Sequence, residues 1–387
     1  MSPDVVVVGA GIVGAACAYY LSRAGLRVTV LERGAVASGT SSAGEGNLLV
    51  SDKEPGPELA LAVRSNALWL TLGEEVGGFE LDRKGSVMVA SSAAALSGLA
   101  SLALNQQAYG LTARALSEPE LRELEPHLAP GFAGGAFYPQ DMQVQPMLAA
   151  ARLLAASGAA VRCGVTVTGL RRAGGRVIAV ETASGDVVST PVVVNAAGTW
   201  AGSVFASAGV RLPIAPRRGF ILVTEPLPPL IRHKVHNTDY LANVASDDAG
   251  LQASAVVEGT AAGTVLIGST RERVGFDRTF SLPALRLLAA NALRMFPGLA
   301  GVSVMRAYRG FRPYSPDHLP VIGADPQVAG LWHACGHEGA GIGLAPATGD
   351  LITALITGTQ PAVDPVPFAP ARFAAPAHSS ALPANGD

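Results

Sequence analysis

The sequence is poor in charged residues and in cysteine, and both shortages exclude classes of protein. Charged residues make up 15% of the 387 residues and the formal net charge is −2, so the composition indicates no basic surface for nucleic acid. The three cysteines, Cys17, Cys163 and Cys335, lie far apart and include no Cys-x-x-Cys pair. We therefore expect no nucleic-acid partner, no disulfide framework, no iron–sulfur cluster and no metal site in this chain.

A leader sequence and a membrane span are also not expected. The first strand is predicted almost at the N-terminus, which leaves no room for a charged segment and a signal sequence. Residues 5–21 are apolar, but the glycines within them favour a buried strand and helix over a membrane-spanning helix. The sequence thus predicts a cytoplasmic protein without a transmembrane segment, long enough for two domains with substantial cores.

The strongest pattern present is a nucleotide-binding motif near the N-terminus. A run of four valines ends just before Gly9 and predicts a buried parallel strand. Gly9, Gly11 and Gly14 follow with the spacing G-x-G-x-x-G, which permits a tight turn, a close approach of the backbone to a pyrophosphate and close packing of the next helix. That helix is predicted over residues 15–24, and its N-terminal N–H groups favour a diphosphate.

A second strand, predicted over residues 27–31, ends at Glu32. This residue follows Gly14 by eighteen positions, where a carboxylate can accept hydrogen bonds from both hydroxyl groups of an adenosine ribose. The loop from Arg33 to Asn47 is rich in small and hydroxyl-bearing residues, and we interpret it as a second wall of the cofactor site rather than an ordinary surface loop. The residues predicted to offer donors to phosphate, or backbone near the reactive ring, are Thr40, Ser41, Ser42, Glu45, Gly46 and Asn47.

Residues 192–201 predict another buried parallel strand that ends in small residues, among them the run Ala-Ala-Gly at 196–198. Small residues at a strand end favour the approach of a ligand, although an ordinary core sheet is the alternative. We therefore place Ala197, Gly198 and Trp200 beside the nucleotide. A later glycine-rich loop, residues 336–343, leads into a helix and forms a second place suited to negative charge.

The chain as a whole predicts an α/β fold, in which a Rossmann-like dinucleotide-binding domain is interleaved with an α+β substrate domain built on a mainly antiparallel sheet. The expected division of the chain is 1–78, 135–215 and 300–358 for the dinucleotide-binding domain, and 79–134 and 216–299 for the substrate domain.

Several local elements are also predicted. Residues 146–157 and 282–295 have the apolar periodicity of amphipathic helices. Residues 79–90 are expected to form a hairpin, and a strand over 161–168 is expected to pair with the next one along the chain. Residues 359–387 are rich in proline and alanine with little periodicity, so we expect a disordered tail.

Four separated motifs together resemble the D-amino-acid-oxidase-like family of FAD-dependent amine oxidoreductases, over residues 4–358. They are the glycine triplet with Glu32, the run Ala-Ala-Gly-Thr-Trp at 196–200, Gly310-Phe-Arg-Pro313 with Asp317, and Gly336-His337 leading to Leu344-Ala-Pro-Ala-Thr-Gly349. Within the family, residues 45–53, 268–276 and 337–341 look like the β (FAD) subunits of heteromeric dye-linked dehydrogenases. That group includes D-hydroxyproline dehydrogenase, which these runs resemble most, opine oxidase and hydrogen cyanide synthase.

The resemblance implies that FAD is the cofactor and that it is bound non-covalently. Members with covalent flavin carry a cysteine near position 311 or 312, where this chain has Phe311 and Arg312. The backbone of Val167 is implied to meet the adenine. The other residues implied to line FAD are Ile12, Val13, Glu32, Arg33, Thr40, Ser41, Glu45, Gly46, Asn47, Leu48 and Gly310, and, near the isoalloxazine, Gly336, His337, Glu338, Gly339, Ala340, Gly341 and Ile342.

The resemblance also implies the chemistry, which is hydride transfer from the Cα–H of an amino acid to flavin N5, giving an imino acid. Arg312 matches the arginine that holds the substrate carboxylate, a task that a planar guanidinium performs bidentately and a lysine cannot. A surface or interdomain salt bridge is the alternative for Arg312. We place His337 beside it at the catalytic centre as a cofactor-lining residue and not as a base, because no base is demanded if the amine binds neutral. Glycine-oxidase-like members carry a second arginine after the Gly-His pair, where this chain has Gly339, so that contact is absent or replaced.

The function implied is that of the catalytic β subunit of a D-hydroxyproline-dehydrogenase-like complex, whose other subunits carry further redox centres and allow attachment to a membrane surface. Alternatives are an opine, glycine, sarcosine or proline oxidase or dehydrogenase, including an autonomous oxidase that uses oxygen. An alternative of another class is a non-catalytic flavin subunit that relays electrons. Tyr240, Gln252 and Tyr314 are candidates for the substrate pocket, but the sequence does not distinguish them from core residues.

Overall fold

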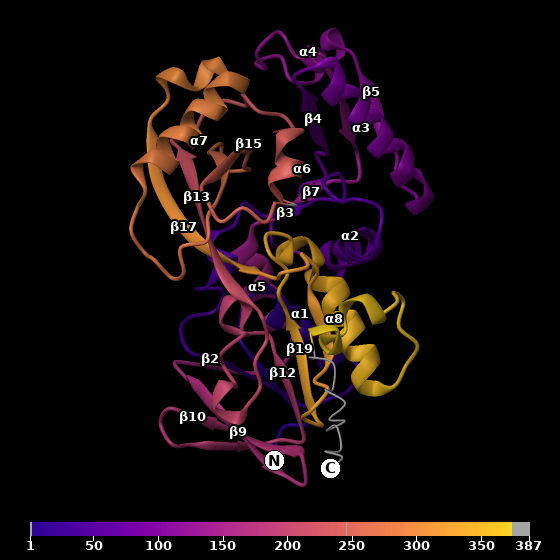
Figure 1. Ribbon diagram of the computed structural model, residues 1–387, viewed down its shortest axis with the longest axis vertical. Coiled ribbons are helices and arrows are strands. Elements are labelled where there is room, and N and C mark those ends of the chain that lie inside the picture. The colour runs from indigo at the N-terminus through magenta and orange to yellow at the C-terminus, as the bar shows by residue number, and fades with distance from the viewer. Residues whose placement is uncertain (1, 245, 374–387) are drawn as a thin grey trace, which may run out of the picture.

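The chain folds around two large β-sheets, one in each half of the molecule (Figure 1). The computed structural model describes residues 2–244 and 246–373. The predicted α/β architecture, with one parallel and one mainly antiparallel sheet, is confirmed. In the described part of the chain, no helix is both long and apolar enough to cross a lipid bilayer.

The sheet of the lower half in Figure 1 is the parallel one, and it contains the N-terminal motif. Its strand order is β18 (Val321–Ala324), β19 (Leu331–Cys335), β12 (Val192–Asn195), β1 (Val5–Val8), β2 (Val28–Glu32) and β8 (Ala160–Cys163). All neighbours pair in parallel except β18 and β19. The carboxyl ends of β1, β2 and β12 therefore meet at one edge, where ligands of such sheets bind.

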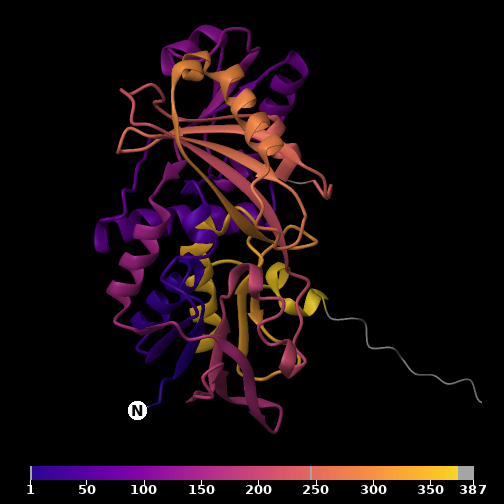
Figure 2. The same ribbon diagram turned by 90° about the vertical axis from the view of Figure 1, so that its left-hand side faces the viewer.

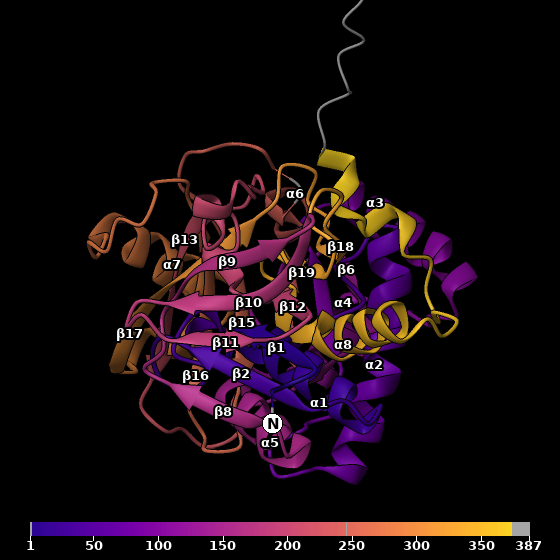
Figure 3. The same ribbon diagram turned by 90° about the horizontal axis from the view of Figure 1, so that it is seen from below.

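Both faces of the parallel sheet are covered, which explains the run of valines in β1. On one face lie the helices α1 (Ile12–Arg23), α2 (Pro57–Glu75), α5 (Pro146–Ser157) and α8 (Gly341–Thr357). On the other lies a small antiparallel sheet of β9 (Val167–Ala173), β10 (Arg176–Thr182) and β11 (Val187–Ser189), seen from below in Figure 3. Because side chains alternate along a strand, Val5 and Val7 pack on the helices, whereas Val6 and Val8 pack on the small sheet.

The sheet of the upper half is mainly antiparallel, and its strands come from distant parts of the chain. Its order is β17 (Val304–Tyr314), β13 (Ala215–Thr224), β16 (Val265–Arg271), β15 (Gln252–Gly259), β14 (Lys234–Asn237), β4 (Ser86–Ala90), β6 (Gly134–Tyr138) and β5 (Arg114–Leu116). The pair β14 and β4 is parallel. The helices of this half are α3 (Ala93–Gln106), α4 (Glu118–Leu124), α6 (Asp239–Val244) and α7 (Leu282–Met295).

The two faces of this upper sheet have different chemistry. Leu222, Val235, Val257 and Ile267 point toward α7, where they pack with Leu288 and neighbouring residues in one apolar core. Figure 2 shows α7 on the outer side of the sheet. The alternate residues of the same strands face inward, and several of them are polar or glycine. The sheet thus presents an apolar face to α7 and a more polar face to the interior of the molecule.

Two local predictions differ from the structure, and two predicted helices agree with it. Residues 79–90 do not form a hairpin, because β4 pairs with β6 and β14 and not with the segment before it. The strand expected over 161–168 is split, since β8 joins the parallel sheet beside β2 while β9 begins at Val167 and pairs with β10. The predicted helices 146–157 and 282–295 agree with α5 and α7.

The expected domain boundaries at 135 and 300 also differ from the sheets. They assign β6 and β17 to the dinucleotide-binding domain, yet both strands pair within the upper sheet. For β17 the reason is that it runs between the two halves of the molecule. It belongs to the upper sheet because it pairs with β13 along its whole length.

The tail expected to be disordered from residue 359 is ordered as far as 373. Short 3₁₀ turns, η6 (Val366–Phe368) and η7 (Pro370–Phe373), lie against β18, and Phe368 is fully buried. Arg372 forms an ion pair with Asp317, with 2.6 Å between Nε and Oδ2. Burial of one aromatic ring and this pair hold a segment without any periodic pattern. Residues 374–387 lie outside the described part of the chain.

Candidate active site

One cavity lies between the two large sheets, and most of its walls are loops at the ends of strands. It is lined by the turn after β1, the end of β2, the loop 38–47, the start of β9, the end of β12, inner positions of β13 and β17, and the loop before α8. The predicted site residues that line it are Gly9, Gly11, Ile12, Val13, Glu32, Arg33, Thr40, Ser41, Glu45, Gly46, Asn47, Val167, Ala197, Gly198, Trp200, Gly310, Arg312, His337, Glu338, Gly339, Gly341 and Ile342. Motifs far apart in the sequence therefore meet at one place.

The turn after β1 requires glycine for steric reasons. Gly9 has a φ of 110°, and a Cβ at this position would lie 2.5 Å from the carbonyl oxygen of Ala196. A Cβ at Gly14 would lie 2.0 Å from the carbonyl oxygen of Gly9. The N-terminus of α1 therefore packs tightly under the turn and opens toward the cavity. There the N–H of Ile12 donates to Oγ of Ser41 over 3.0 Å, so backbone and hydroxyl groups suited to a diphosphate stand together.

The carboxylate of Glu32 is held in place at the end of β2. Its oxygens accept hydrogen bonds from the N–H of Ala10, at 2.9 Å, and from the N–H of Gly34, at 2.7 Å. Nearby, the guanidinium of Arg33 lies 3.8 Å over the ring of Trp200, and Trp200 stacks on Phe276 with 5.4 Å between centroids. Arg33 and Trp200 thus wall this end of the cavity, and Phe276 packs on Trp200 from the other half of the molecule.

His337 is a neutral group at the other end of the cavity. Its Nε2 lies 2.9 Å from Oγ1 of Thr348, whose own hydroxyl donates to the carbonyl of Leu344. Thr348 must then accept, so Nε2 of His337 carries the proton and Nδ1 keeps its lone pair. Burial lowers the pKa of His337 to about 3. A neutral imidazole fixed in one tautomer agrees with a lining role.

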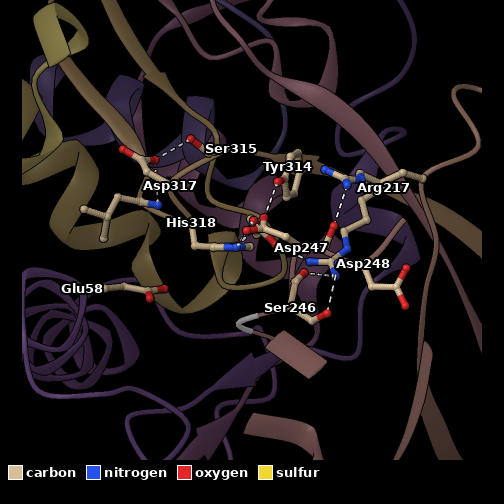
Figure 4. Close-up of polar contacts among 12 residues, drawn as sticks. Glu58, Arg217, Ser246, Asp247, Asp248, Tyr314, Ser315, Asp317 and His318 are labelled. Carbon is tan, nitrogen blue, oxygen red and sulfur yellow. Dashed lines mark hydrogen bonds and ion pairs between the residues drawn. The ribbon is translucent and has the colours of Figure 1, made fainter. Parts of the chain in front are cut away.

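Glu338 lines the cavity, but its carboxylate serves a polar network rather than a ligand. It accepts hydrogen bonds from Nη1 of Arg217, at 3.2 Å, and contacts Nδ1 of His318, at 2.8 Å. His318 and Tyr314 also contact Asp247, as Figure 4 shows. Hydrogen bonding to Glu338 raises the pKa of His318. The network fastens the loop around Asp247 to the segment before α8.

Arg312 is a cation that lines the cavity together with Arg33, which lies over Trp200. Arg312 stands on β17, and its Nη1 donates to the carbonyl of Thr270 over 2.8 Å. Within residues 2–244 and 246–373 no carboxylate forms an ion pair with it. Burial, and secondly the positive charge of Arg271, lower the pKa of Arg312 to about 10, so the group keeps its charge at neutral pH. A guanidinium without an ion-paired carboxylate in a recessed site is suited to bind one.

Glycines make the room that Arg312 occupies. A Cβ at Gly219 would lie 2.2 Å from its Nη1, and a Cβ at Gly339 would lie 3.3 Å from its Nε. Gly339 therefore packs against the guanidinium, at the position where the family resemblance implied a second arginine. The positive charges that do act on Arg312 come instead from Arg271 and Arg217.

Five residues expected at the cofactor do not line the cavity. Gly14 lies behind the turn and packs on Gly9, and Leu48 is part of the apolar core. The hydroxyl of Ser42 donates back to the carbonyl of Gly39. Gly336 packs against Ile214 and Val321, and Ala340 serves as the N-terminal cap residue of α8. These residues shape the walls from behind.

The sequence interpretation missed several polar residues near the cavity. Arg217 and Arg271 are buried, and Lys234 pairs with Glu258 over 2.5 Å on neighbouring strands. A buried charge within an apolar strand is a signal that could have found them, because it must face a polar interior. Of the open candidates, Tyr240 lines the cavity. In the described residues no three His, Cys, Asp or Glu side chains are grouped so as to hold a metal ion.

The fold and this cavity are typical of dinucleotide-binding proteins, and comparison with known families leads to the same class. The family model described as FAD dependent oxidoreductase matches residues 4–355, so the chain belongs to this family. The glycine turn, the hydroxyl at the start of α1 and the fixed carboxylate of Glu32 fit such a dinucleotide. The chain is an FAD-dependent oxidoreductase that acts on C–N donors.

Individual relatives cover nearly the whole chain. It is 33% identical over 388 residues to a glycine oxidase of Pseudomonas putida, covering 96% of this chain and 99% of the relative. It is 30% identical over 416 residues to hydrogen cyanide synthase subunit HcnC of Pseudomonas aeruginosa, covering 96% of each. Among solved structures, glycine oxidase from Geobacillus kaustophilus has a TM-score of 0.87 at 28% identity, covering 96% of this chain and 99% of the other. L-proline dehydrogenase from P. horikoshii has a TM-score of 0.88 at 24% identity, covering 96% and 98%, which shows a common fold.

Proposed function

We propose that the chain oxidises an amino or imino acid, as the catalytic subunit of a complex similar to D-hydroxyproline dehydrogenase. The single observation that supports this most is Arg312, a charged guanidinium that lines the cavity and has no carboxylate partner within the described residues. A substrate carboxylate would supply that partner. A scaffold that only relays electrons has no use for such a group.

The residues of the chain would bind and orient the substrate. With Nη1 of Arg312 occupied by Thr270, its remaining donors can hold the two oxygens of a carboxylate. This fixes the position of Cα, while apolar residues such as Ile221 and Ile342 exclude water from it. FAD, when bound, supplies the acceptor for the hydride of Cα–H.

The same proposal assigns places to the cofactor. The diphosphate would lie at the N-terminus of α1 near Ser41, the ribose at Glu32 and the adenine at the backbone of Val167. The isoalloxazine would lie along the loop from His337 to Ile342. Since Phe311 and Arg312 stand where covalent members carry cysteine, the flavin would be held non-covalently.

The substrate we propose is a cyclic imino acid such as D-hydroxyproline. The runs 45–53, 268–276 and 337–341 support it through their resemblance to the subunits of heteromeric dehydrogenases, and a relative of 30% identity is itself named as a subunit. Electrons would then leave through partner subunits. Glycine is the second candidate substrate, because relatives of 33% identity are named glycine oxidases.

Anaerobic reduction of the bound flavin tests this function. The purified chain would be mixed with a panel of D- and L-amino acids and imino acids, and its visible absorption followed. We expect one class, led by cyclic imino acids, to bleach the flavin within seconds to minutes. If dithionite bleaches the flavin and no member of the panel does, the chain is not an amino-acid dehydrogenase and the relay alternative gains support.

A further inference from the structure

Glu45 is a buried carboxylate at the cavity wall with an oxygen that lacks a partner. The residue lies just before β3 (Asn47–Leu48), is 7% exposed, and lines the same cavity as Arg312. Nδ2 of Asn47 donates to its Oε2 over a long 3.4 Å, whereas no described residue donates to Oε1. An ionised buried carboxylate normally accepts more hydrogen bonds than this.

The fold makes a place for this side chain. A Cβ at Gly268 would lie 2.2 Å from Oε1 of Glu45, so the absence of a side chain on β16 admits the carboxylate. The hydroxyl of Tyr308 donates to the carbonyl of Gly44 over 3.2 Å and fixes the loop over β17. The position of Glu45 above the inner face of the sheet is therefore enforced from two strands.

The charges around Glu45 come from three strands. Lys234 on β14 and Glu258 on β15 form a buried ion pair with each other, and Arg312 on β17 contributes a further positive charge. Tyr308, also on β17, is a further titratable group that interacts with it. Burial, opposed by Lys234 and reinforced by Glu258, raises the pKa of Glu45 to about 7. A carboxyl group of this kind exchanges its proton near neutral pH.

We propose that Glu45 accepts the proton of the substrate ammonium group, and this inference rests on the proposed function. An amino acid enters as a zwitterion, with its carboxylate toward Arg312 and its nitrogen one bond away from the same Cα. One N–H bond breaks, its electron pair stays on nitrogen, and the proton bonds to the carboxylate of Glu45. The neutral amine would then use that electron pair to form C=N, and FAD, when bound, would supply the acceptor for the hydride that leaves Cα. The product is an iminium ion, and no charge is lost or gained.

Charge balance favours this arrangement over binding without a base. Arg312 neutralises the carboxylate, so an ammonium ion would leave a net positive charge in a recessed site unless an anion faces it. Ionised Glu45 provides that anion, and proton transfer turns the pair into two neutral groups. Glu45 is not needed to neutralise the charge of Lys234, because Glu258 already forms an ion pair with that lysine.

The test is the pH dependence of Glu45→Gln with the amino acid that the wild type oxidises best. In the wild type, kcat/KM requires ionised Glu45 and falls tenfold per pH unit below about 7. In the variant only substrate with a neutral amine reacts, so the rising limb should move to about 9, between the usual values for α-amino and lysine ammonium groups. At pH 7 the loss should be about 100-fold, shrinking as the pH rises. Glu272→Gln, which removes a buried carboxylate paired with Arg218 outside the cavity, is the matched control and should keep the wild-type limb.

A second readout does not depend on turnover. Infrared difference spectra of the flavin-loaded protein between pH 6 and pH 8 should show the carbonyl band of protonated Glu45 disappearing, and Glu45→Gln should lack this component. Buried Asp141, whose pKa is raised to about 6 by burial, should contribute its own component in both proteins. Suppose that the wild type oxidises amino acids, and that Glu45→Gln keeps the wild-type pH profile with kcat/KM within twofold. The proposed function then stands and the inference about Glu45 is wrong. Failure of the wild type with every amino acid would instead refute the proposed function. The infrared titration would then decide whether Glu45 exchanges a proton, and the lack of a titrating band that Glu45→Gln removes would overturn the inference.

Discussion

Replacing Arg312 tests the site most directly, because the structure shows which hydrogen bonds and which charge each replacement removes. One donor of the guanidinium is committed to Thr270, and the donors that remain can make two charge-assisted hydrogen bonds to a carboxylate. Arg312→Lys keeps the charge but loses the planar fork, and with it at least one bond of roughly 1.5–3 kcal/mol. We expect the transition state for the best amino acid to lose about 2–4 kcal/mol of stabilisation, so kcat/KM should fall about 30- to 1,000-fold. Arg312→Met should lose more.

The assay is steady-state reduction of an artificial dye, together with measurements of FAD content and thermal unfolding. Both should stay close to wild type, because Arg312 is one of many residues around the cavity. Arg309→Lys is the matched control on the same strand, since Arg309 lies over the ring of Phe280 and not in the cavity wall. Amines without a carboxylate should lose much less than amino acids in the Arg312 variants. Near wild-type oxidation of an amino acid by Arg312→Met would show that the carboxylate is held elsewhere.

Two further predictions concern the cofactor and its oxidant. Acid or heat should release intact FAD from the protein, because Phe311 and Arg312 leave no cysteine to bond it; flavin that stays on the denatured chain would refute non-covalent binding. Turnover of the isolated chain with oxygen should be much slower than with an artificial dye, because electrons are proposed to leave through partner subunits; equal rates of hydrogen peroxide formation and dye reduction would argue for an autonomous oxidase.

Local patterns were enough to predict the parts of the fold that local physics decides. Helix α7 begins after Ser281, whose side chain caps it by accepting from the N–H of Ala284, and it ends before Pro297. Strand β1 is buried on both faces, so its unbroken valines were a reliable signal. The glycine turn likewise carried its own steric reason.

The parts that were missed depend on pairings between distant strands. The sequence assigned only the backbone of Glu45 to the site, because nothing local says that Gly268 leaves room for its carboxylate. Glu338 was expected at the cofactor, but Arg217 and His318, 121 and 20 residues away in the chain, engage its side chain. The order within residues 359–373 depends on the buried ring of Phe368 and on the ion pair of Arg372 with Asp317, and such contacts have no periodic signature.

The alternation of inward-facing and outward-facing residues along the strands of the upper sheet has a consequence for protein engineering. Ile221 lies at the cavity and its neighbour Leu222 in the core under α7, so adjacent codons control substrate fit and stability separately. A library aimed at a new substrate would vary Ile221 and Tyr240, which line the cavity, and would leave Leu222 and Ile267 untouched. Changes of selectivity would then be sampled on a scaffold whose hydrophobic core is never part of the search.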